Sequence, residues 1–172
     1  MTNTQNFINY EYLEIFVENK FRDLYLDSYP HFGWYVTTVT AAKNHQSKIA
    51  ISLKRNRVMT NKAELVRLQS KFEALVKQLN IIDNKNELIP TVYACLIGII
   101  GTIFIGLAFL TYQYSNLFLS LIVSLPGFTG WITPYWFYKY FKKIITGKNT
   151  VVVNQIYDEI FKTCRRAQGL KQ

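Results

Sequence analysis

The sequence predicts an α+β membrane protein, in which a two-helix transmembrane hairpin is joined to a small N-terminal cytoplasmic α+β domain and a C-terminal amphipathic helix. The first observation is a run of 51 residues, Leu88 to Tyr138, that contains no Asp, Glu, Lys or Arg. A transmembrane helix needs about 20 predominantly apolar residues, and this run holds two such lengths on either side of the polar segment Gln113–Asn116. The other observations are alternating strand patterns before the run and an apolar stripe at helical spacing after it.

The charge distribution predicts how the hairpin is oriented. Of the formal charge of +9, residues 1–87 contribute twelve Lys and Arg against nine Asp and Glu, whereas residues 139–172 contribute eight against two. The hairpin tip, Thr111 to Leu117, has no charge. Because short loops rich in Lys and Arg stay on the cytoplasmic side, both termini are expected there. Met1–Lys20 lacks a basic segment followed by an apolar one, so the first span is expected to act as its own insertion signal.

Residues 1–59 are expected to form the cytoplasmic head. A strand is predicted near Tyr12–Val17, followed by a helix from Asn19 to Tyr29 that ends at Pro30 and Gly33. The apolar residues of this stretch also fit one long helical stripe, which is the alternative.

A β-hairpin is predicted after this helix. Trp34–Thr40 is rich in aromatic and β-branched residues, and Lys48–Lys54 alternates between apolar and polar side chains. The alternation places Ile49, Ile51 and Leu53 on one face of a half-buried strand. Lys48, Ala50, Ser52 and Lys54 then lie on the other face.

Residues 60–88 are predicted to form an amphipathic stalk helix. Thr60 or Asn61 is expected to cap it, and Glu64 is placed to reach back to Asn61 in a capping box. The segment Asp83–Asn86 is expected to interrupt the helix at the membrane surface. The apolar seam consists of Leu65, Leu68, Phe72, Leu75 and Leu79.

Residues 89–138 are predicted to be the hairpin itself, with spans at Ile89–Tyr112 and Leu117–Tyr138. A stripe of small residues at spacing four is expected to let a neighbouring helix approach closely. The stripe consists of Ala94, Gly98, Thr102 and Gly106. Its partner is expected to be the side of the second span that bears Ser120, Ser124 and Gly127, and the alternative is a homodimer or larger ring through the same stripe.

Residues 139–172 are predicted to form a basic cytoplasmic tail, in which Gly147 breaks the chain before an amphipathic helix at Val151–Leu170. Its apolar face is predicted to consist of Val153, Ile156, Tyr157, Ile160, Phe161, Cys164 and Ala167. This face is expected to pack antiparallel on the stalk helix or on the sheet of the same chain. The alternatives are a face on another subunit and a helix lying flat in the lipid interface.

The sequence contains no recognisable catalytic set, and we expect neither an enzyme nor a cofactor or metal. The uncharged run offers none of the ionisable residues that mark proton relays and ion paths in membrane helices. His31 and His45 are expected at opposite ends of a strand, too far apart to share a metal. Cys95 and Cys164 are expected to be packing residues.

One basic cluster stands out at the end of the β-hairpin. Lys54, Arg55 and Arg57, beside Trp34 and Tyr35, are interpreted as a possible exposed surface for a protein partner or an anionic ligand. A solvated strand end and attraction to anionic lipid are the alternatives. The weak net charge of the head and the lack of a reading motif argue against nucleic acid.

Three lysines directly after the second span are better placed for lipid headgroups than the basic cluster of the head. They are Lys139, Lys142 and Lys143. Lysines at the end of a span lie where anionic headgroups are found.

Four short segments resemble an uncharacterised family of small double-spanning membrane proteins of Gram-positive bacteria. They are Phe32–Trp34, Leu53–Arg57, Asn61–Leu65 and Pro126–Trp131. The resemblance implies the same layout and a bacterial cytoplasmic membrane, and it carries no catalytic or binding residues.

These observations favour a membrane-anchored, non-enzymatic adaptor or accessory subunit that presents its head to another protein. The alternative is a subunit of an oligomeric pore or transporter, with Ser120, Ser124, Thr129 and Thr133 facing a central path. The lack of charge for selectivity or coupling opposes that alternative.

Overall fold

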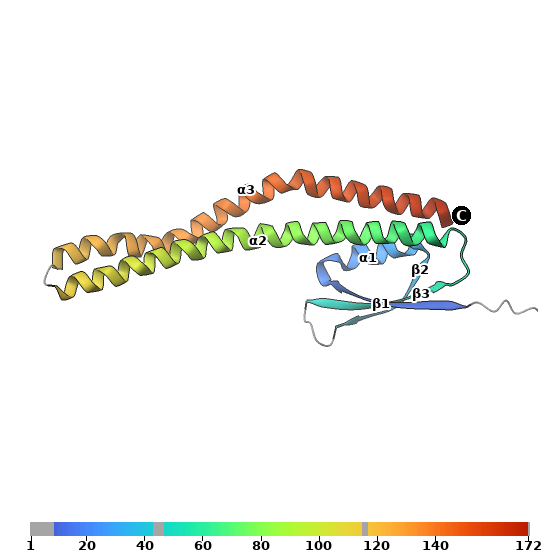
Figure 1. Cartoon of the computed structure of the whole chain (residues 1–172), viewed down its shortest axis with the longest axis horizontal. Coiled ribbons are helices and arrows are strands. Elements are labelled where there is room, and N and C mark those ends of the chain that lie inside the picture. The colour runs from blue at the N-terminus through green and yellow to red at the C-terminus, as the bar shows by residue number, and fades with distance from the viewer. Residues whose placement is uncertain (1–8, 43–46, 115–116, 172) are drawn as a thin grey trace, which may run out of the picture. The chain divides into compact units, whose positions relative to one another are not determined.

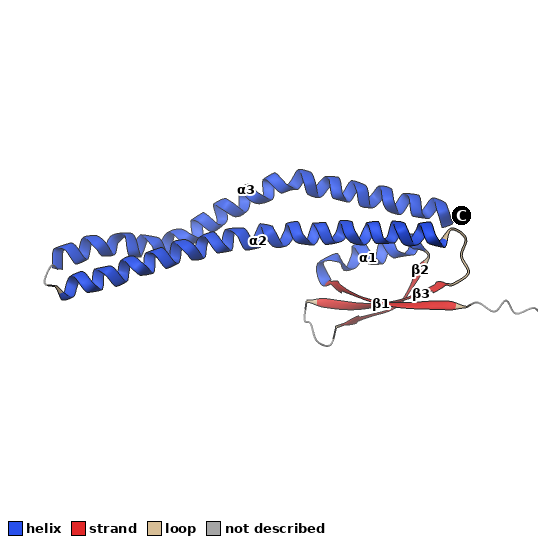
Figure 2. Cartoon of the chain, viewed as in Figure 1, coloured by secondary structure: helices blue, strands red, loops and turns tan. Residues whose placement is uncertain are grey.

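The structure is a computed structural model that describes residues 9–42, 47–114 and 117–171. The described chain has three strands and two long helices, with short helical turns between the first two strands (Figures 1 and 2). It divides into two compact units, Met1–Lys77 with Ile156–Gln172, called the head below, and Gln78–Gln155, called the hairpin below. The α+β class and two helices long and apolar enough to cross a membrane are therefore confirmed.

The head contains a three-stranded antiparallel sheet of order β1-β3-β2. Its strands are β1 (Tyr10–Glu18), β2 (Trp34–Ala41) and β3 (Lys48–Asn56). The predicted hairpin is confirmed as β2 and β3, and the predicted first strand pairs with the other edge of β3. Because β1 and β2 both run antiparallel to β3, they are parallel to each other, as in a split β-α-β unit.

The connection from β1 to β2 is helical but is not one regular helix. The 3-10 turn η1 (Asn19–Phe21) leads into α1 (Arg22–Ser28), and the 3-10 turn η2 (Tyr29–Phe32) follows. Helical structure thus continues past Pro30 to Phe32, three residues beyond the predicted end. Gly33 then ends it with a φ of 87°, a left-handed conformation that glycine adopts without a Cβ penalty.

The remaining chain consists of two uninterrupted helices, α2 (Lys62–Gln113) and α3 (Leu117–Lys171). The expected interruption at Asp83–Asn86 is wrong, and so is the expected break at Gly147. Neither segment contains proline, and one glycine inside a helix costs only about 1 kcal/mol. The helical structure on either side can therefore continue through both segments.

The core of the head is built around four aromatic rings on one face of the sheet. The ring centroid of Phe72 on α2 lies 5.3 Å from that of Tyr25, 6.1 Å from that of Tyr29 and 5.6 Å from that of Phe32. Figure 1 shows α1 and α2 on the same side of the strands. The predicted seam of α2 is confirmed at Leu65, Leu68, Phe72 and Leu79, which are buried, whereas Val76 takes the place expected for Leu75.

The beginning of α2 and the end of α3 pack antiparallel within one chain, as predicted. The side chain of Asn61 donates a hydrogen bond to the carbonyl of Leu170 at 3.4 Å, and Lys71 pairs with Glu159 at 3.0 Å. The capping box is wrong, because Asn61 has a φ of 60° and the Glu64 carboxylate instead accepts two bonds from Arg67. An N-cap residue of a capping box has extended backbone angles, which Asn61 lacks.

The buried face of the C-terminal helix differs in part from the predicted face. Ile156, Ile160, Cys164 and Ala167 are buried as expected, but Tyr157 and Phe161 are 46% and 67% exposed. Thr163 is buried in their place, and its hydroxyl donates to the carbonyl of Glu159. The contact stripe is therefore narrower than the apolar stripe of the sequence.

In the hairpin, α2 and α3 approach each other most closely at three glycines. A Cβ on Gly101 would lie 3.0 Å from the carbonyl oxygen of Gly127, and one on Gly130 would lie 2.8 Å from the Cα of Gly101. The hydroxyl of Ser120 donates to the carbonyl of Ala108 at 2.8 Å, which confirms the expected side of the second span. Because glycine has no side chain, the two helix backbones can come this close, and van der Waals contact between them then stabilises the pair.

The predicted small-residue stripe meets α3 only in part, at Thr102, whose hydroxyl accepts a hydrogen bond of 3.4 Å from the Trp131 indole. A Cβ on Gly98 or Gly106 would have no heavy atom of α3 within 4 Å, and Thr102 is otherwise exposed. Ala94 is half-buried. The face of α2 that meets α3 is rotated toward Gly101 and Ala108. Residues spaced by four do not stay on one face of a helix with 3.6 residues per turn, so the predicted stripe winds away from this contact.

Candidate functional site

The interpretation of Trp34 and Arg55 as exposed residues of a partner surface is wrong. Arg55 is only 4% exposed and Trp34 only 5%. The guanidinium of Arg55 lies 4.3 Å from the ring centroid of Trp34, and the indole N–H donates to Gln69 on α2 at 2.8 Å. Both residues belong to the core of the head, so no partner can reach them without unfolding.

Arg55 is held by a carboxylate on the neighbouring strand. Glu11 stands opposite Arg55 in the β1–β3 register, and its Oε1 accepts bonds of 2.5 Å from both Nε and Nη2 of Arg55. Lys62 at the start of α2 binds the other carboxylate oxygen at 2.7 Å. Burial raises the pKa of Glu11, but the hydrogen bonds and charges of Lys62 and Arg55 outweigh it and hold the pKa below its ordinary value of 4.5.

This cluster predicts an acid-sensitive head. A carboxylate whose pKa is lowered by folding stabilises the folded state above its unfolded pKa, and the stabilisation is lost as the pH falls through the folded pKa. The free energy of unfolding of the full chain in detergent is therefore expected to fall as the pH is lowered below 4.5. Glu11→Gln is expected to flatten this dependence in denaturant titrations at several pH values. Glu14→Gln, at an exposed position of the same strand, is the matched control, and an equal flattening by both variants would contradict the assignment to Glu11.

A second polar network links β2, η2 and α2 inside the head. Tyr29 donates to Glu73 at 2.8 Å, and Gln69 donates to the same oxygen at 2.9 Å while accepting from Trp34. Burial, followed by the charge of Glu73, raises the pKa of Tyr25 to about 12 and raises that of Tyr29 further. Both phenols stay protonated at neutral pH, and Tyr29 is hydrogen-bonded to Glu73, which suits a packing role.

The face of the sheet turned away from the helices carries exposed aromatic side chains. Tyr12 and Phe16 of β1 are 75% and 62% exposed, and Tyr12 pairs in register with Lys54 of β3. We call this surface the outer sheet face, and it comprises Tyr12, Glu14, Phe16, Thr37, Ser52 and Lys54. A depression of about 440 Å³ crosses it, lined by side chains from all three strands. Exposed aromatic patches of this kind mark interaction sites more often than isolated apolar residues do.

Of the five residues predicted for a partner surface, three remain accessible. Lys54 is half-buried on the outer sheet face, with its ammonium 5.2 Å from the Tyr10 ring centroid, and Arg57 is exposed beyond β3. Tyr35 lies on the edge strand β2, is 54% exposed and has the Lys171 ammonium 5.5 Å from its ring centroid. Tyr35 pairs in register with Lys54, so these two predicted residues lie side by side on one face of the sheet, and sequence analysis missed Tyr12 and Phe16 beside them.

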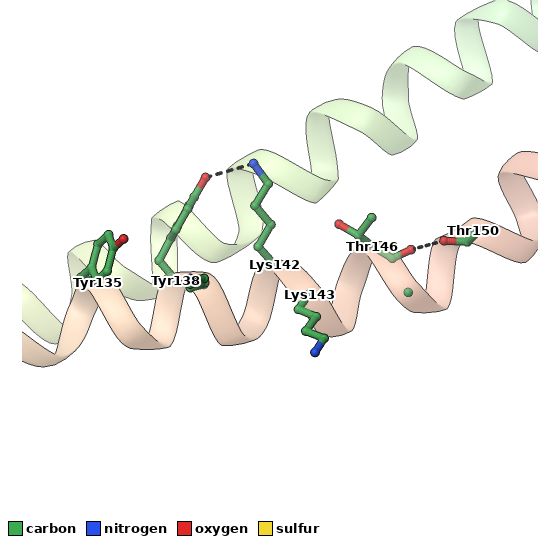
Figure 3. A pocket seen from close by; sticks show the side chains of 8 residues that line it. Tyr135, Tyr138, Lys142, Lys143, Thr146 and Thr150 are labelled. Atoms are coloured by element: carbon green, nitrogen blue, oxygen red, sulfur yellow. Dashed lines mark hydrogen bonds between the residues drawn. The ribbon is translucent and has the colours of Figure 1, made fainter.

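The lysines predicted for lipid contact lie together on one face of α3. Lys139, Lys142 and Lys143 line a groove of about 450 Å³ with Tyr135, Tyr138, Thr146, Gly147 and Thr150 (Figure 3). Lys142 points toward the Tyr138 hydroxyl, at 3.4 Å, while Lys143 points away from it. The groove belongs entirely to the hairpin unit.

The described residues contain no group of three or more His, Cys, Asp or Glu side chains that could hold a metal ion. His31 borders a shallow depression with Pro30, Gln168 and Lys171 in the head, whereas His45 lies outside the described residues. Burial raises the pKa of the Cys164 thiol, which a hydrogen bond from Ser28 only partly offsets. A protonated, buried thiol is a poor nucleophile.

Comparisons with known proteins add no family assignment. No protein-family model, curated protein or solved structure matches this chain.

Proposed function

We propose that this protein is an integral membrane adaptor or accessory subunit without enzymatic activity of its own. In this proposal α2 and α3 cross a bacterial cytoplasmic membrane, and the head binds another protein at the cytoplasmic side. The proposal rests on the outer sheet face, because this face exposes the large aromatic side chains of Tyr12 and Phe16, which are 75% and 62% exposed.

Membrane insertion is supported by the surface of the two long helices. Only 11% of the most apolar 18-residue window of α2 is buried, and only 6% of that of α3. A core helix of a soluble protein would bury most of such a window. In water these faces would be a large exposed apolar surface, whereas lipid covers them at no cost.

The orientation follows from the lysines at the ends of the two apolar segments. Lys77 and Lys85 precede the first segment, Lys139 to Lys148 follow the second, and the described part of the connection between the helices has no charge. Basic residues near span ends remain cytoplasmic, so the head and both termini are proposed to lie on that side.

The partner is proposed to present apolar side chains to Tyr12 and Phe16 and a carboxylate to Lys54. Aromatic residues that become desolvated at the centre of an interface supply much of its binding energy. Lys54 contributes an opposite charge that favours an acidic partner segment over a basic one.

Site-specific photocrosslinking in the native membrane tests this proposal. A photoreactive phenylalanine analogue at Tyr12 or Phe16 is expected to give a discrete protein adduct, because these side chains would face the partner. The analogue at Arg165, an exposed residue of α3, is the control and is expected to give none. Lys54→Glu is expected to reduce the adduct at Phe16 several-fold while changing the free energy of unfolding by less than about 0.5 kcal/mol.

Two outcomes would contradict the proposal. Adducts at Tyr12 and Phe16 no stronger than at Arg165 would leave the outer sheet face without a partner. Reporter fusions that place either terminus outside the cell would contradict the proposed cytoplasmic location of the head.

The pore or transporter alternative has weaker support. The hydroxyls of Ser120, Ser124, Thr129 and Thr133 all donate to backbone carbonyls. Hydroxyls bonded in this way are satisfied within helices and do not need a water-filled path. Ion flux through liposomes that contain a cross-linked oligomer would favour this alternative over the adaptor.

A further inference from the structure

The groove on α3 is lined by one face of the helix and is open at Gly147. Its lining residues recur at steps of three and one from Tyr135 to Thr150, so they occupy one continuous face of the helix. Gly147 forms part of this face, and apart from its chain neighbours and the nearby backbone of α3, a Cβ there would have no heavy atom within 4 Å. A side chain larger than glycine would therefore project into open space and narrow the groove without straining the backbone.

The groove is positively charged and lacks neutralising groups on its own helix. No Asp or Glu occurs in α3 between Leu117 and Tyr157, and Lys148 adds a fourth cation beside the groove. Within the described chain these four lysines form no ion pair, whereas Lys62 and Lys71 in the head are both paired.

The facing helix α2 brings two acidic residues to the same end of the hairpin. They are Asp83 and Glu87, on either side of Asn86, whose side chain accepts a hydrogen bond of 2.6 Å from Asn149. Neither acid lines the groove. Lys139, Lys142 and Lys143 precede Asn149 on α3, toward the apolar run. These three lysines outnumber the two acidic residues, so the groove keeps an excess of positive charge.

The groove also lies where a headgroup would be found. Lys139 follows directly after the uncharged run, and Tyr135, Trp136 and Tyr138 precede it, as in the aromatic belts at membrane interfaces. Lys139 and Lys143 are separated by about 6 Å along the helix axis. This rise matches the interfacial layer of a bilayer, which is about 5–8 Å thick on each side.

We propose that this groove binds the phosphate headgroup of an anionic phospholipid from the cytoplasmic leaflet. Lys139, Lys142 and Lys143 supply the charge, and the hydroxyls of Tyr138 and Thr146 border the same space. The open position at Gly147 admits the headgroup. The inference rests on the membrane insertion that belongs to the proposed function, but not on the protein partner.

A free phosphate in solution is a weaker match than a lipid. Lys139 and Lys143 are exposed and Lys142 is half-buried, and salt screens the attraction of exposed charges to a soluble ion beyond about 8 Å. A leaflet supplies anionic headgroups at high local concentration, and its surface potential favours each nearby lysine by about fivefold.

Quenching of tryptophan fluorescence by brominated lipids tests the proposal on the full chain. Trp136 lies between the groove-lining residues Tyr135 and Tyr138, and Trp131 lies about 1.4 helical turns further into the apolar run. In vesicles of phosphatidylcholine and phosphatidylglycerol, brominated phosphatidylglycerol is expected to bind about tenfold more strongly than brominated phosphatidylcholine. The triple variant Lys139→Gln, Lys142→Gln and Lys143→Gln is expected to reduce this preference to less than about twofold.

Two matched controls separate a groove from a diffuse charge effect. Lys162→Gln with Arg165→Gln and Arg166→Gln removes the same charge from the far end of α3 and is expected to keep the preference. Gly147→Leu keeps every charge but fills the groove, and is expected to lower the preference at least threefold, whereas Gly147→Ala keeps it. An equal loss in the two triple variants, or no effect of Gly147→Leu, would overturn the proposal.

Two further arms identify the source of the ligand. Inorganic phosphate at 10 mM, roughly the highest cellular level, is expected to leave the lipid preference unchanged because of salt screening. Displacement of the anionic lipid by inorganic phosphate would overturn the lipid assignment. In vesicles of brominated phosphatidylcholine alone, strong quenching is expected, and its absence would refute membrane insertion and thus the proposed function itself.

Discussion

Replacing Arg55 by alanine is expected to lower the free energy of unfolding of the head by about 3 kcal/mol. The guanidinium is buried, binds Glu11 through two nitrogens and stacks over Trp34. Alanine removes the ion pair and the cation–π contact and leaves a partly buried carboxylate with Lys62 as its remaining partner. Denaturant unfolding of the full chain in detergent, followed by tryptophan fluorescence, measures the loss.

Two variants test whether this effect belongs to the buried guanidinium. Arg57→Ala, two residues further along, removes an exposed charge and is expected to change the free energy of unfolding by less than about 0.5 kcal/mol. Arg55→Lys is expected to lie between wild type and Arg55→Ala, because lysine keeps the charge but cannot form the two-nitrogen contact. Equal stabilities of Arg55→Ala and Arg57→Ala would show that the interior of the head is assigned wrongly.

Replacing Gly101 by leucine is expected to separate α2 from α3 and to destabilise the hairpin by about 3 kcal/mol. A Cβ at this position would lie 3.0 Å from the Gly127 carbonyl oxygen and 3.1 Å from the carbonyl carbon of Gly130. Both neighbours are backbone atoms, so neither can rotate away, and the helices themselves must move. The expected result is a lower midpoint in an SDS titration of the full chain in mixed micelles.

The same substitution at two neighbouring glycines provides the control. Gly98→Leu and Gly106→Leu introduce an identical side chain at positions where a Cβ would have no heavy atom of α3 within 4 Å. Both are expected to leave the SDS midpoint near that of wild type in the monomeric protein. If Gly98→Leu or Gly106→Leu lowers the midpoint as much as Gly101→Leu, then the small-residue stripe predicted from sequence is the true contact.

The burial of Arg55 could have been inferred from the alternating pattern of β3, but the charge of the residue argued against it. In β3 the buried Ile51, Leu53 and Arg55 alternate along one face, so the arginine follows the same alternation as the apolar residues. The alternation alone indicates an inward side chain, but a charged residue is ordinarily taken to be exposed. The compensating carboxylate, Glu11, is 44 residues away in the chain, and only strand pairing brings the two together.

The outer sheet face was missed for a related reason. Tyr12 and Phe16 are aromatic, so sequence analysis counts them toward a core, although they alternate with the buried face of β1. Which face of a strand is buried depends on where the helices pack, and that is a tertiary contact. The lysine groove was easier to anticipate, because its residues are close in sequence and lie on one helix.

The sequence by itself determined the strands, the two apolar helices and the lysines at their ends. Each of these depends on composition or on a short repeat, and such local patterns follow from backbone geometry. Only the tertiary structure decided that α2 and α3 continue without a break, that Gly101 rather than Gly98 meets the neighbouring helix, and that Arg55 is buried. These features depend on atoms brought together from distant parts of the chain, since packing selects one face among several that the sequence allows.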